Sequence, residues 1–229
     1  MNSQYENLAG QYSAKPDGYY ETTRSEMLPF IPAESSSILE IGCSSGAFGK
    51  LIKNERPGTV VWGIEPDEES AKKALKNLDH VICSTFSTEL EELKGKKFDV
   101  ICMNDVLEHM VNPDTVLLDC KSFLSPNGMI VASIPNILHF YNITQILLHQ
   151  DWKYEDSGIM DNTHLRFFTK KSIIRMFEGC GYNIARIEGI NASFGMKYRL
   201  ANALTLGHLK DWKYVQFVIQ AQPLSKDVL

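Results

Sequence analysis

Short runs of β-branched and other apolar residues alternate with segments of helical spacing through the first two thirds of the chain. This alternation constrains the fold more than any other feature, because it is typical of a parallel sheet whose strands are joined by helices. The expected strands are residues 37–41, 59–64, 80–83, 98–103, 129–134, 183–188 and 214–221, and the expected helices are residues 18–30, 47–53, 68–78, 113–124 and 170–178. The sequence therefore predicts an α/β fold with a doubly wound, seven-stranded, mostly parallel sheet.

The length of 229 residues fits a single domain. Residues 1–35 are expected to form an N-terminal helical cover and residues 36–135 a ligand-binding core. Residues 136–169 are too long for a plain strand-to-helix connection, and loops of this size are usually lids or binding elements. Residues 170–229 complete the sheet and carry a second insertion near 192–208. We expect the N-terminal cover and the lid together to roof a pocket.

The composition excludes several classes of protein. Lys and Arg number 23 against 28 Asp and Glu, and the net charge of -5 gives no positive field for wrapping nucleic acid. The five cysteines contain no C-x-x-C pair, which favours reduced thiols and a cytoplasmic location. We expect no signal peptide, because residues 1–20 have no basic region followed by an apolar run. We expect no membrane span, because the most apolar stretch, residues 129–148, is interrupted by polar side chains.

A turn rich in small residues follows the first expected strand, and it includes Gly42, Ser44 and Gly46. Such a turn lets backbone N–H groups approach a ligand, although a tight strand-to-helix turn needs glycine even without one. Glu65, followed by Pro66, ends the next strand about 20 residues on, where a carboxylate can accept both ribose hydroxyls. Glu40 precedes the turn, and its charge favours a ligand with an ammonium and a sulfonium over a dinucleotide pyrophosphate. This indicates S-adenosylmethionine rather than NAD.

The runs ILEIGCSSG, VVWGIEPD, FDVICMNDVLEH and MIVASIPN, in this order, resemble the successive motifs of class I S-adenosylmethionine-dependent methyltransferases, over residues 36–135. The resemblance implies a Rossmann-like fold, S-adenosyl-L-methionine as cofactor and S-adenosyl-L-homocysteine as product. Two departures stand out. Ser44 replaces the middle glycine of the first motif, and the family's acidic adenine-binding residue is missing where Thr85 and Phe86 stand.

The same resemblance suggests roles for further residues near the cofactor. Ser84 or Thr85 would bond the adenine while Phe86 packs on its ring. Asn104 and Asp105, after the fourth strand, would lie along the methionyl part. Arg24, on the leading helix, would meet the cofactor carboxylate, against the alternative of an ordinary surface arginine.

A second run, GIMDNTHLRFFT at residues 158–169, follows SIPN in the lid. Together they resemble bacterial methyltransferases of the type-11/12 group associated with surface-glycan biosynthesis. The implied reaction is O-methylation of a sugar, nucleotide sugar or glycan precursor. A sugar hydroxyl needs a base, and histidine suits that task at neutral pH. His164 is the candidate, oriented by Asp161, with His109 in reserve; the alternative is that His164 only ties the lid to the sheet.

Acceptor contacts are expected from the lid as well, at Asn136, His139, Tyr154 and Arg166. Arg166 would clamp a phosphate or carboxylate, with a salt bridge to Asp161 or Glu155 as the alternative. His139 belongs to a polar helical stripe that would line the acceptor cleft, or form a solvated face. No cluster of histidines and carboxylates shows metal-ligand spacing, so we expect metal-independent chemistry.

Competing functions remain open at this point. They are a methyltransferase for an N or carboxyl acceptor, a cofactor-binding module without catalysis, and an NAD-dependent oxidoreductase. The expected partner is a small-molecule or glycan acceptor, not a nucleic acid. The oligomeric state is left open, a homodimer included.

Overall fold

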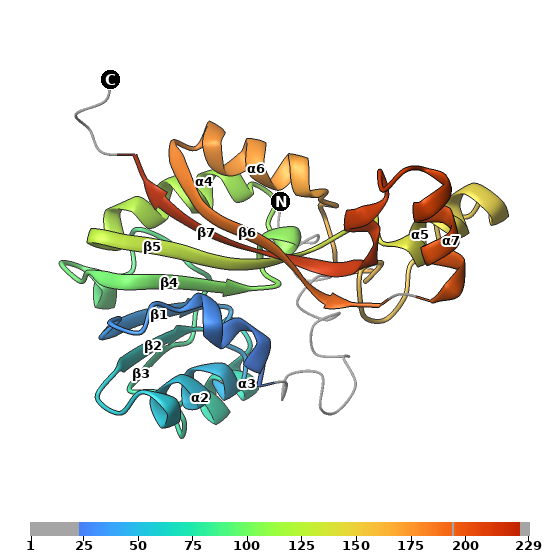
Figure 1. Ribbon diagram of the computed structural model, residues 1–229. Coiled ribbons are helices and arrows are strands. Elements are labelled where there is room, and N and C mark those ends of the chain that lie inside the picture. The colour runs from blue at the N-terminus through green and yellow to red at the C-terminus, as the bar shows by residue number, and fades with distance from the viewer. Residues whose placement is uncertain (1–22, 194, 225–229) are drawn as a thin grey trace.

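A seven-stranded sheet forms the centre of the protein, whose computed structural model describes residues 23–193 and 195–224 (Figure 1). The strands are β1 (Ser37–Ile41), β2 (Val60–Ile64), β3 (His80–Ile82), β4 (Phe98–Asn104), β5 (Leu124–Pro135), β6 (Tyr182–Ala192) and β7 (Tyr214–Pro223). Their order in the sheet is β3-β2-β1-β4-β5-β7-β6. Strands β1 to β5 pair in parallel, whereas β7 is antiparallel to both β5 and β6. The predicted fold class is therefore confirmed.

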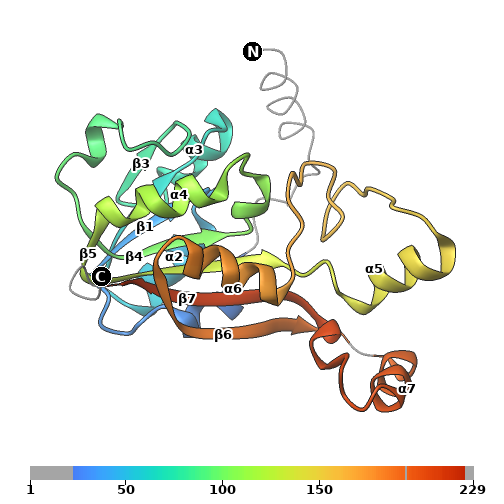
Figure 2. The same ribbon diagram turned by 90° about the horizontal axis from the view of Figure 1, so that it is seen from above.

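Both faces of the sheet are covered, which explains why the central strands are apolar at nearly every position. Ile38 and Val100 contribute to one buried cluster, and the adjacent Leu39 and Ile101 contribute to the other. The helices are α2 (Ala47–Glu55), α3 (Glu68–Ala74), α4 (Pro113–Cys120), α5 (Phe140–Thr144), α6 (Lys170–Gly179) and α7 (Met196–Leu204). Helices α4 and α6 cover one face (Figures 1 and 2), and α2 and α3 contribute to the cluster on the opposite face.

Several predicted boundaries are corrected. The 18–30 helix falls partly outside the described residues, and its described part is a 3-10 helix, Ser25–Phe30, with Pro29 inside it. The helix predicted over 68–78 ends at Ala74 but does begin after Asp67, whose side chain accepts the Ser70 N–H. The helix predicted over 113–124 ends at Cys120, and a 3-10 turn, Lys121–Phe123, follows.

Strand β5 starts earlier than the sequence predicts. Leu124 pairs with Phe98 and Met129 pairs with Val100, so residues 125–128 bulge out of the strand opposite one residue of β4. The residues expected to form a separate turn are therefore part of an irregular strand. The Asp99 carboxylate at this bulge accepts hydrogen bonds from Ser125 Oγ at 3.1 Å and from the Ser36 N–H at 2.9 Å.

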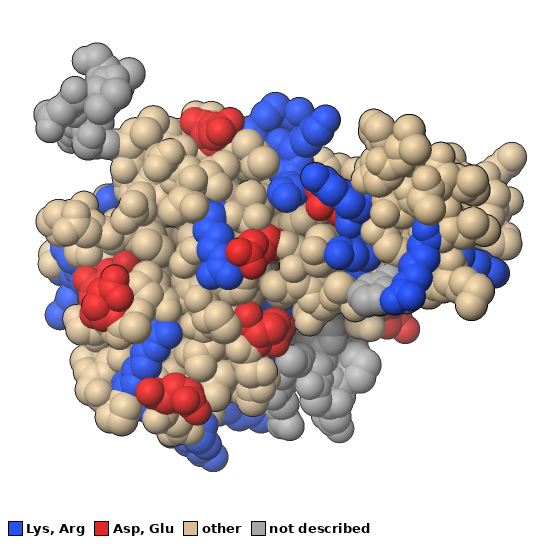
Figure 3. Space-filling view, viewed as in Figure 1, with Lys and Arg blue, Asp and Glu red and all other residues tan. Residues whose placement is uncertain are grey.

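The two insertions lie together beyond the end of the sheet (Figures 1 and 2). The lid contains α5 and a π-helical turn, Gln145–His149, and the second insertion contains α7. The rings of Phe140 and Tyr198 join them, with centroids 5.7 Å apart. Among the described residues, none of the helices is long and apolar enough to cross a bilayer. Acidic and basic side chains are interspersed over the sheet end of the face in Figure 3.

Candidate active site

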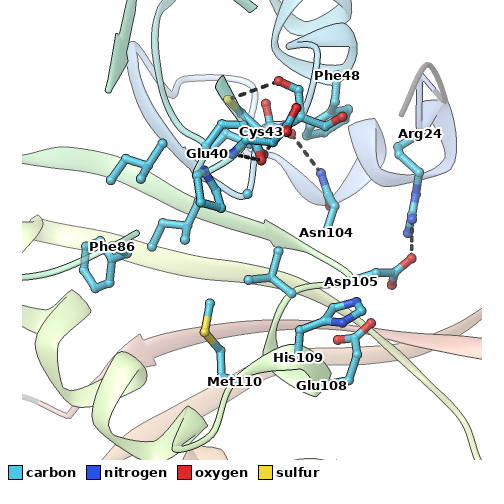
Figure 4. A pocket seen from close by; sticks show the side chains of 18 of the residues that line it. Arg24, Glu40, Cys43, Phe48, Phe86, Asn104, Asp105, Glu108, His109 and Met110 are labelled. Carbon is cyan, nitrogen blue, oxygen red and sulfur yellow. Dashed lines mark hydrogen bonds and ion pairs between the residues drawn. The ribbon is translucent and has the colours of Figure 1, made fainter. Parts of the chain in front are cut away.

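A cavity of about 640 Å³ opens at the carboxyl ends of the parallel strands (Figure 4). In open α/β sheets this edge is where ligands bind. The predicted cofactor-binding residues that line it are Arg24, Glu40, Gly42, Ser44, Glu65, Pro66, Thr85, Phe86, Asn104 and Asp105. His109 and His164 line it too. The structure therefore gathers most of the predicted site in one place.

The small-residue turn after β1 has the backbone shape that the sequence predicts. Gly42 has φ 71°, and a Cβ at this position would lie 2.7 Å from Cγ2 of Val106. Ser44 also has a positive φ, 49°, although it is not glycine. Gly46 begins α2 and lies against Ala74 and Leu78, so it does not line the cavity. The absence of a side chain at Gly46 lets the start of α2 pack against Ala74 and Leu78.

Glu65 directly follows β2, and its side chain points toward the turn after β1. Its carboxylate accepts hydrogen bonds from the Ser44 N–H at 2.8 Å and from the Asp67 N–H at 3.0 Å. Burial raises the pKa of Glu65. Each carboxylate oxygen has two lone pairs, so both can accept a further bond from a ligand hydroxyl. The position fits a ribose diol.

Glu40 lies deeper, at 3% exposure. Asn104 Nδ2 donates to its Oε1 at 3.3 Å, while Oε2 has no hydrogen-bond partner among the described residues. Burial raises the pKa of Glu40 to about 8. A cation that enters the cavity would stabilise the ionised carboxylate and supply the missing contact. This unpartnered oxygen fits the ammonium or sulfonium of S-adenosylmethionine.

Arg24 is held at the cavity by a network centred on Asp105 (Figure 4). The guanidinium donates to the Asp105 carboxylate and, at 2.8 Å, to Ser133 Oγ. Gln216 Nε2 donates to the same carboxylate at 2.6 Å. Asp105 has φ 54°, a strained conformation that this network maintains. Arg24 is thus a fixed cation beside the cavity rather than a solvated surface residue.

Glu108 and His109 lie across the cavity from Glu40 (Figure 4), and His164, which also lines the cavity, lies beside His109 and forms a cluster with these two residues. Glu108 and His109 lie on a 3-10 turn, Leu107–His109, and His164 comes from the lid. The Glu108 carbonyl accepts the N–H groups of Leu165 at 2.9 Å and Arg166 at 3.0 Å. These bonds hold the lid segment against the turn, so the histidine rings lie with centroids 4.7 Å apart.

Each imidazole of this cluster is oriented through one nitrogen. Nδ1 of His164 lies 3.0 Å from the carbonyl oxygen of Ile159, and Nδ1 of His109 lies 3.2 Å from that of Thr163. A carbonyl only accepts, so Nδ1 carries the proton in both rings. Burial, reinforced by His164, lowers the pKa of His109 to about 4, and burial raises the pKa of Glu108 well above its usual range.

This cluster corrects the expectation that histidines and carboxylates do not gather at metal-ligand spacing. One potential ligand atom from each of Glu108, His109 and His164 lies within 4.8 Å of the others. His109 and His164 are about 55 residues apart in the sequence, so local spacing did not show the group. The Glu108–His109 pair, on the turn that comes after β4, was the available signal, and Glu108 was missed as a site residue.

Asp161 is fully buried and does not line the cavity. Its Oδ1 accepts from the Thr163 N–H at 2.8 Å and from Thr163 Oγ1 at 2.6 Å, and its carbonyl accepts the His164 N–H at 3.0 Å. Asp161 therefore shapes the turn that presents His164.

The predicted acceptor contacts, Asn136, His139, Tyr154 and Arg166, do not line this cavity. Asn136 Nδ2 donates to the carbonyls of Asp211 at 3.2 Å and Tyr214 at 3.0 Å. His139 Nε2 lies 2.6 Å from Ser193 Oγ. Arg166 Nη2 donates to the Val111 carbonyl at 2.7 Å, and Tyr154 is exposed beside Phe167. The hydrogen bonds of Asn136, His139 and Arg166 thus connect parts of the chain to one another.

Comparison with known proteins places the chain in a family. Residues 12–187 match the profile of a family described as a methyltransferase domain. The chain belongs to this methyltransferase family. The match confirms the predicted enzyme class, and the family assignment argues against an NAD-dependent oxidoreductase. S-adenosylmethionine, the expected cofactor, agrees with the family and with the solved structures below.

Curated relatives of this methyltransferase carry the name ubiquinone biosynthesis O-methyltransferase. The protein from Bradyrhizobium diazoefficiens is 30% identical over 102 residues, which are 43% of this chain and 40% of the relative. The protein from Nitrobacter winogradskyi is 25% identical over 192 residues, 75% of this chain and 66% of the relative. The chain thus spans about half the length of the curated relatives it matches. These names do not support the association with surface-glycan biosynthesis.

Solved structures share the fold over nearly the whole chain. A SAM-dependent methyltransferase from Archaeoglobus fulgidus superposes with a TM-score of 0.64 at 18% identity, covering 95% of this chain and 98% of that one. The plantazolicin methyltransferase BpumL, in complex with SAH, superposes with a TM-score of 0.61 at 19% identity, covering 95% and 94%. The overall architecture is therefore that of methyltransferase structures.

Proposed function

We propose that this chain transfers a methyl group from S-adenosylmethionine to a hydroxyl oxygen of a small-molecule acceptor. The observation that carries the proposal is the cavity in this chain of the methyltransferase family. Glu40 lies on one side of it and Glu108 and His109 lie on the other (Figure 4), with His164 also in the lining. The same cavity thus contains a buried carboxylate that a cation would stabilise and a cluster of histidines.

The cofactor would be held by the residues at the strand ends. Glu65 would accept the ribose hydroxyls, and Thr85 and Phe86, which also line the cavity, would meet the adenine. Glu40 would balance the positive charge, and Arg24 would face the carboxylate. Bound S-adenosylmethionine supplies an electrophilic methyl group on a sulfonium. The fit is supported by the buried Glu40 oxygen that has no hydrogen-bond partner among the described residues.

The acceptor would enter beside the histidine cluster. In the transfer, the acceptor oxygen bonds the methyl carbon as the carbon–sulfur bond breaks, and the electron pair stays on sulfur. Such a displacement needs reacting atoms about 3–3.5 Å apart in line. The cluster is the group in the cavity suited to taking the hydroxyl proton. His164, presented by the Asp161 turn, is the proposed catalytic residue, and His109 is the second.

Two indications support the proposed class of acceptor, and both point to oxygen as the atom that is methylated. The 158–169 run suggested a sugar, nucleotide-sugar or glycan-precursor hydroxyl. The curated relatives are named as O-methyltransferases of ubiquinone biosynthesis. We propose an oxygen acceptor on this common ground, with the sugar hydroxyl as the narrower hypothesis.

The experiment is a calorimetric titration with S-adenosylmethionine and, separately, NADH, followed by an activity assay. Sugars, nucleotide sugars, phenols, amines and carboxylates form the acceptor panel. The proposal expects S-adenosylmethionine binding and methylated product with hydroxyl acceptors. Cofactor binding without product across the panel would favour a non-catalytic module, product with amines or carboxylates only would overturn the choice of oxygen, and NADH binding alone would overturn the methyltransferase assignment.

A further inference from the structure

We infer that Glu108, His109 and His164 bind a divalent transition-metal ion that holds the acceptor hydroxyl for methyl transfer. The inference deepens the proposed function and rests on it for the role of the ion. Binding of the ion itself follows from the geometry of the three side chains, and it can be tested without an acceptor.

The three side chains already stand close to a coordination geometry. One ligand atom from each lies within 4.8 Å of the other two, and His164 Nε2 lies 3.9 Å from Glu108 Oε1. Around an ion with ligand distances of about 2.0–2.2 Å, tetrahedral neighbours are about 3.4 Å apart. Each ligand atom would therefore move by about 1 Å or less to close on an ion.

The second observation is the state of the Glu108 carboxylate. The side chain is 1% exposed, and neither oxygen has a hydrogen-bond partner among the described residues. A buried carboxyl group with both oxygens unsatisfied is rare and costly in a folded protein. It lines the cavity beside the histidines, so a cation placed between them would satisfy it. Asp105 does not compete, because its carboxylate already accepts from Arg24, Ser133 and Gln216.

The surroundings of the histidines also match a metal site. Metal-binding imidazoles usually donate their other ring N–H to a carbonyl or carboxylate, which fixes the ring and its tautomer. In this protein, the carbonyls of Ile159 and Thr163 face Nδ1 of His164 and His109. With Nδ1 protonated, Nε2 is the nitrogen of each ring that carries the coordinating lone pair.

The donor set indicates the class of ion. Imidazole suits zinc, iron, copper and nickel, whereas magnesium and calcium prefer oxygen ligands throughout. Two imidazoles and one carboxylate leave coordination positions open, which is the arrangement of catalytic rather than structural zinc sites. All three residues line the cavity, so an oxygen of the acceptor could occupy an open position.

A bound ion would change how the hydroxyl is activated. Coordination lowers the pKa of a hydroxyl, whose proton then passes to solvent before the oxygen attacks the methyl carbon. His164 would then act as a ligand of the ion instead of removing the proton itself. The bonds made and broken in the transfer stay the same.

Metal-stripped full-length protein should be titrated with Zn²⁺ against a chromophoric chelator, and with Co²⁺ while its visible absorption is recorded. We expect one ion per chain and the intense Co²⁺ bands of low coordination number. Loss of an outer-shell partner usually weakens metal binding by about 10- to 100-fold. Glu108→Gln and His164→Ala each change a proposed ligand itself, so each should weaken Zn²⁺ binding by a larger factor. Mg²⁺ should compete poorly.

His208→Asn is the matched control. The Nδ1 of His208 also lies close to a backbone carbonyl, that of Thr205 at 2.7 Å, but His208 is exposed and does not line the cavity. Zn²⁺ affinity should be unchanged in this variant. Equal Zn²⁺ affinity in the wild type, Glu108→Gln and His164→Ala would overturn the inference, as would the absence of stoichiometric Zn²⁺ binding.

Titration of the same samples with S-adenosylmethionine separates this inference from the proposed function. Cofactor binding without Zn²⁺ binding would overturn the metal site and leave the methyltransferase assignment standing. Zn²⁺ binding without cofactor binding would overturn the proposed function and leave the metal site. Thermal unfolding of each variant reports whether it is folded, and Glu108→Gln keeps the size of the side chain.

Discussion

Binding of S-adenosylmethionine should release a proton from Glu40, and Glu40→Gln should abolish that release. The carboxyl is 3% exposed, and burial raises its pKa to about 8. A group with a pKa of about 8 is mostly protonated at pH 7, so the free protein should carry most of a proton on Glu40. A cationic ligand favours the carboxylate and would bring the pKa well below 7. The expected release is therefore more than half a proton per ligand.

Calorimetry at pH 7 in several buffers of different ionisation enthalpy measures this quantity, because the slope of the binding enthalpy against the ionisation enthalpy is the number of protons exchanged. The number of protons exchanged by Glu40→Gln is subtracted from the number exchanged by the wild type. This subtraction removes the protons that the ligand's own amino group exchanges. The difference should shrink above about pH 9, where Glu40 is already ionised in the free protein. An equal slope in the two proteins at pH 7 would show that Glu40 does not face the cofactor cation.

Four further predictions concern other parts of the site and the fold. Glu65→Ala should weaken S-adenosylmethionine binding by about 1.5–3 kcal/mol, the scale of a charged hydrogen bond; an unchanged dissociation constant in a folded variant would place the ribose elsewhere. His164→Ala should lower turnover by roughly 100- to 10,000-fold with cofactor affinity nearly intact; if only the melting temperature falls, His164 is a structural tie. Gly42→Ala should destabilise the fold by about 1–3 kcal/mol in urea unfolding, since its Cβ would lie 2.7 Å from Val106 Cγ2, and wild-type stability would refute the close approach. Wild-type stability relative to Glu40→Gln should fall as the pH rises from about 4.5 to about 8, because the folded protein keeps a proton that the unfolded chain loses; melting curves in parallel over this range would contradict the raised pKa.

The cofactor side of the site could be predicted because its signals are local. Glu40, Gly42 and Glu65 stand at the ends of recognisable strands, and parallel strands bring their carboxyl ends to one edge. The turn chemistry and the side-chain types then indicate the ligand.

The acceptor side was predicted less well because its geometry depends on contacts between distant segments. The insertion expected to act as a lid follows β5, but the direction of each of its side chains is set by tertiary hydrogen bonds. Arg166 turns to the Val111 carbonyl and Asn136 to those of Asp211 and Tyr214. The same backbone bonds that turn Arg166 away bring His164 to Glu108. Sequence spacing contains no record of these contacts.

The early start of β5 has a similar cause. Residues 125–128 have the composition of a turn, and that composition is consistent with a bulge as well. Pairing of Leu124 with Phe98 on the neighbouring strand decides between the two, and this pairing is a property of the sheet rather than of the segment.

The most direct test of the account is to supply S-adenosylmethionine with an isotopically labelled methyl group to the protein and the acceptor panel, and to analyse the products by mass spectrometry. The account predicts a labelled methyl ether on a hydroxyl acceptor and an equal amount of S-adenosylhomocysteine, both formed at least about 100-fold more slowly by His164→Ala. Labelled product on amines or carboxylates alone, or bound cofactor that is never consumed, would contradict it.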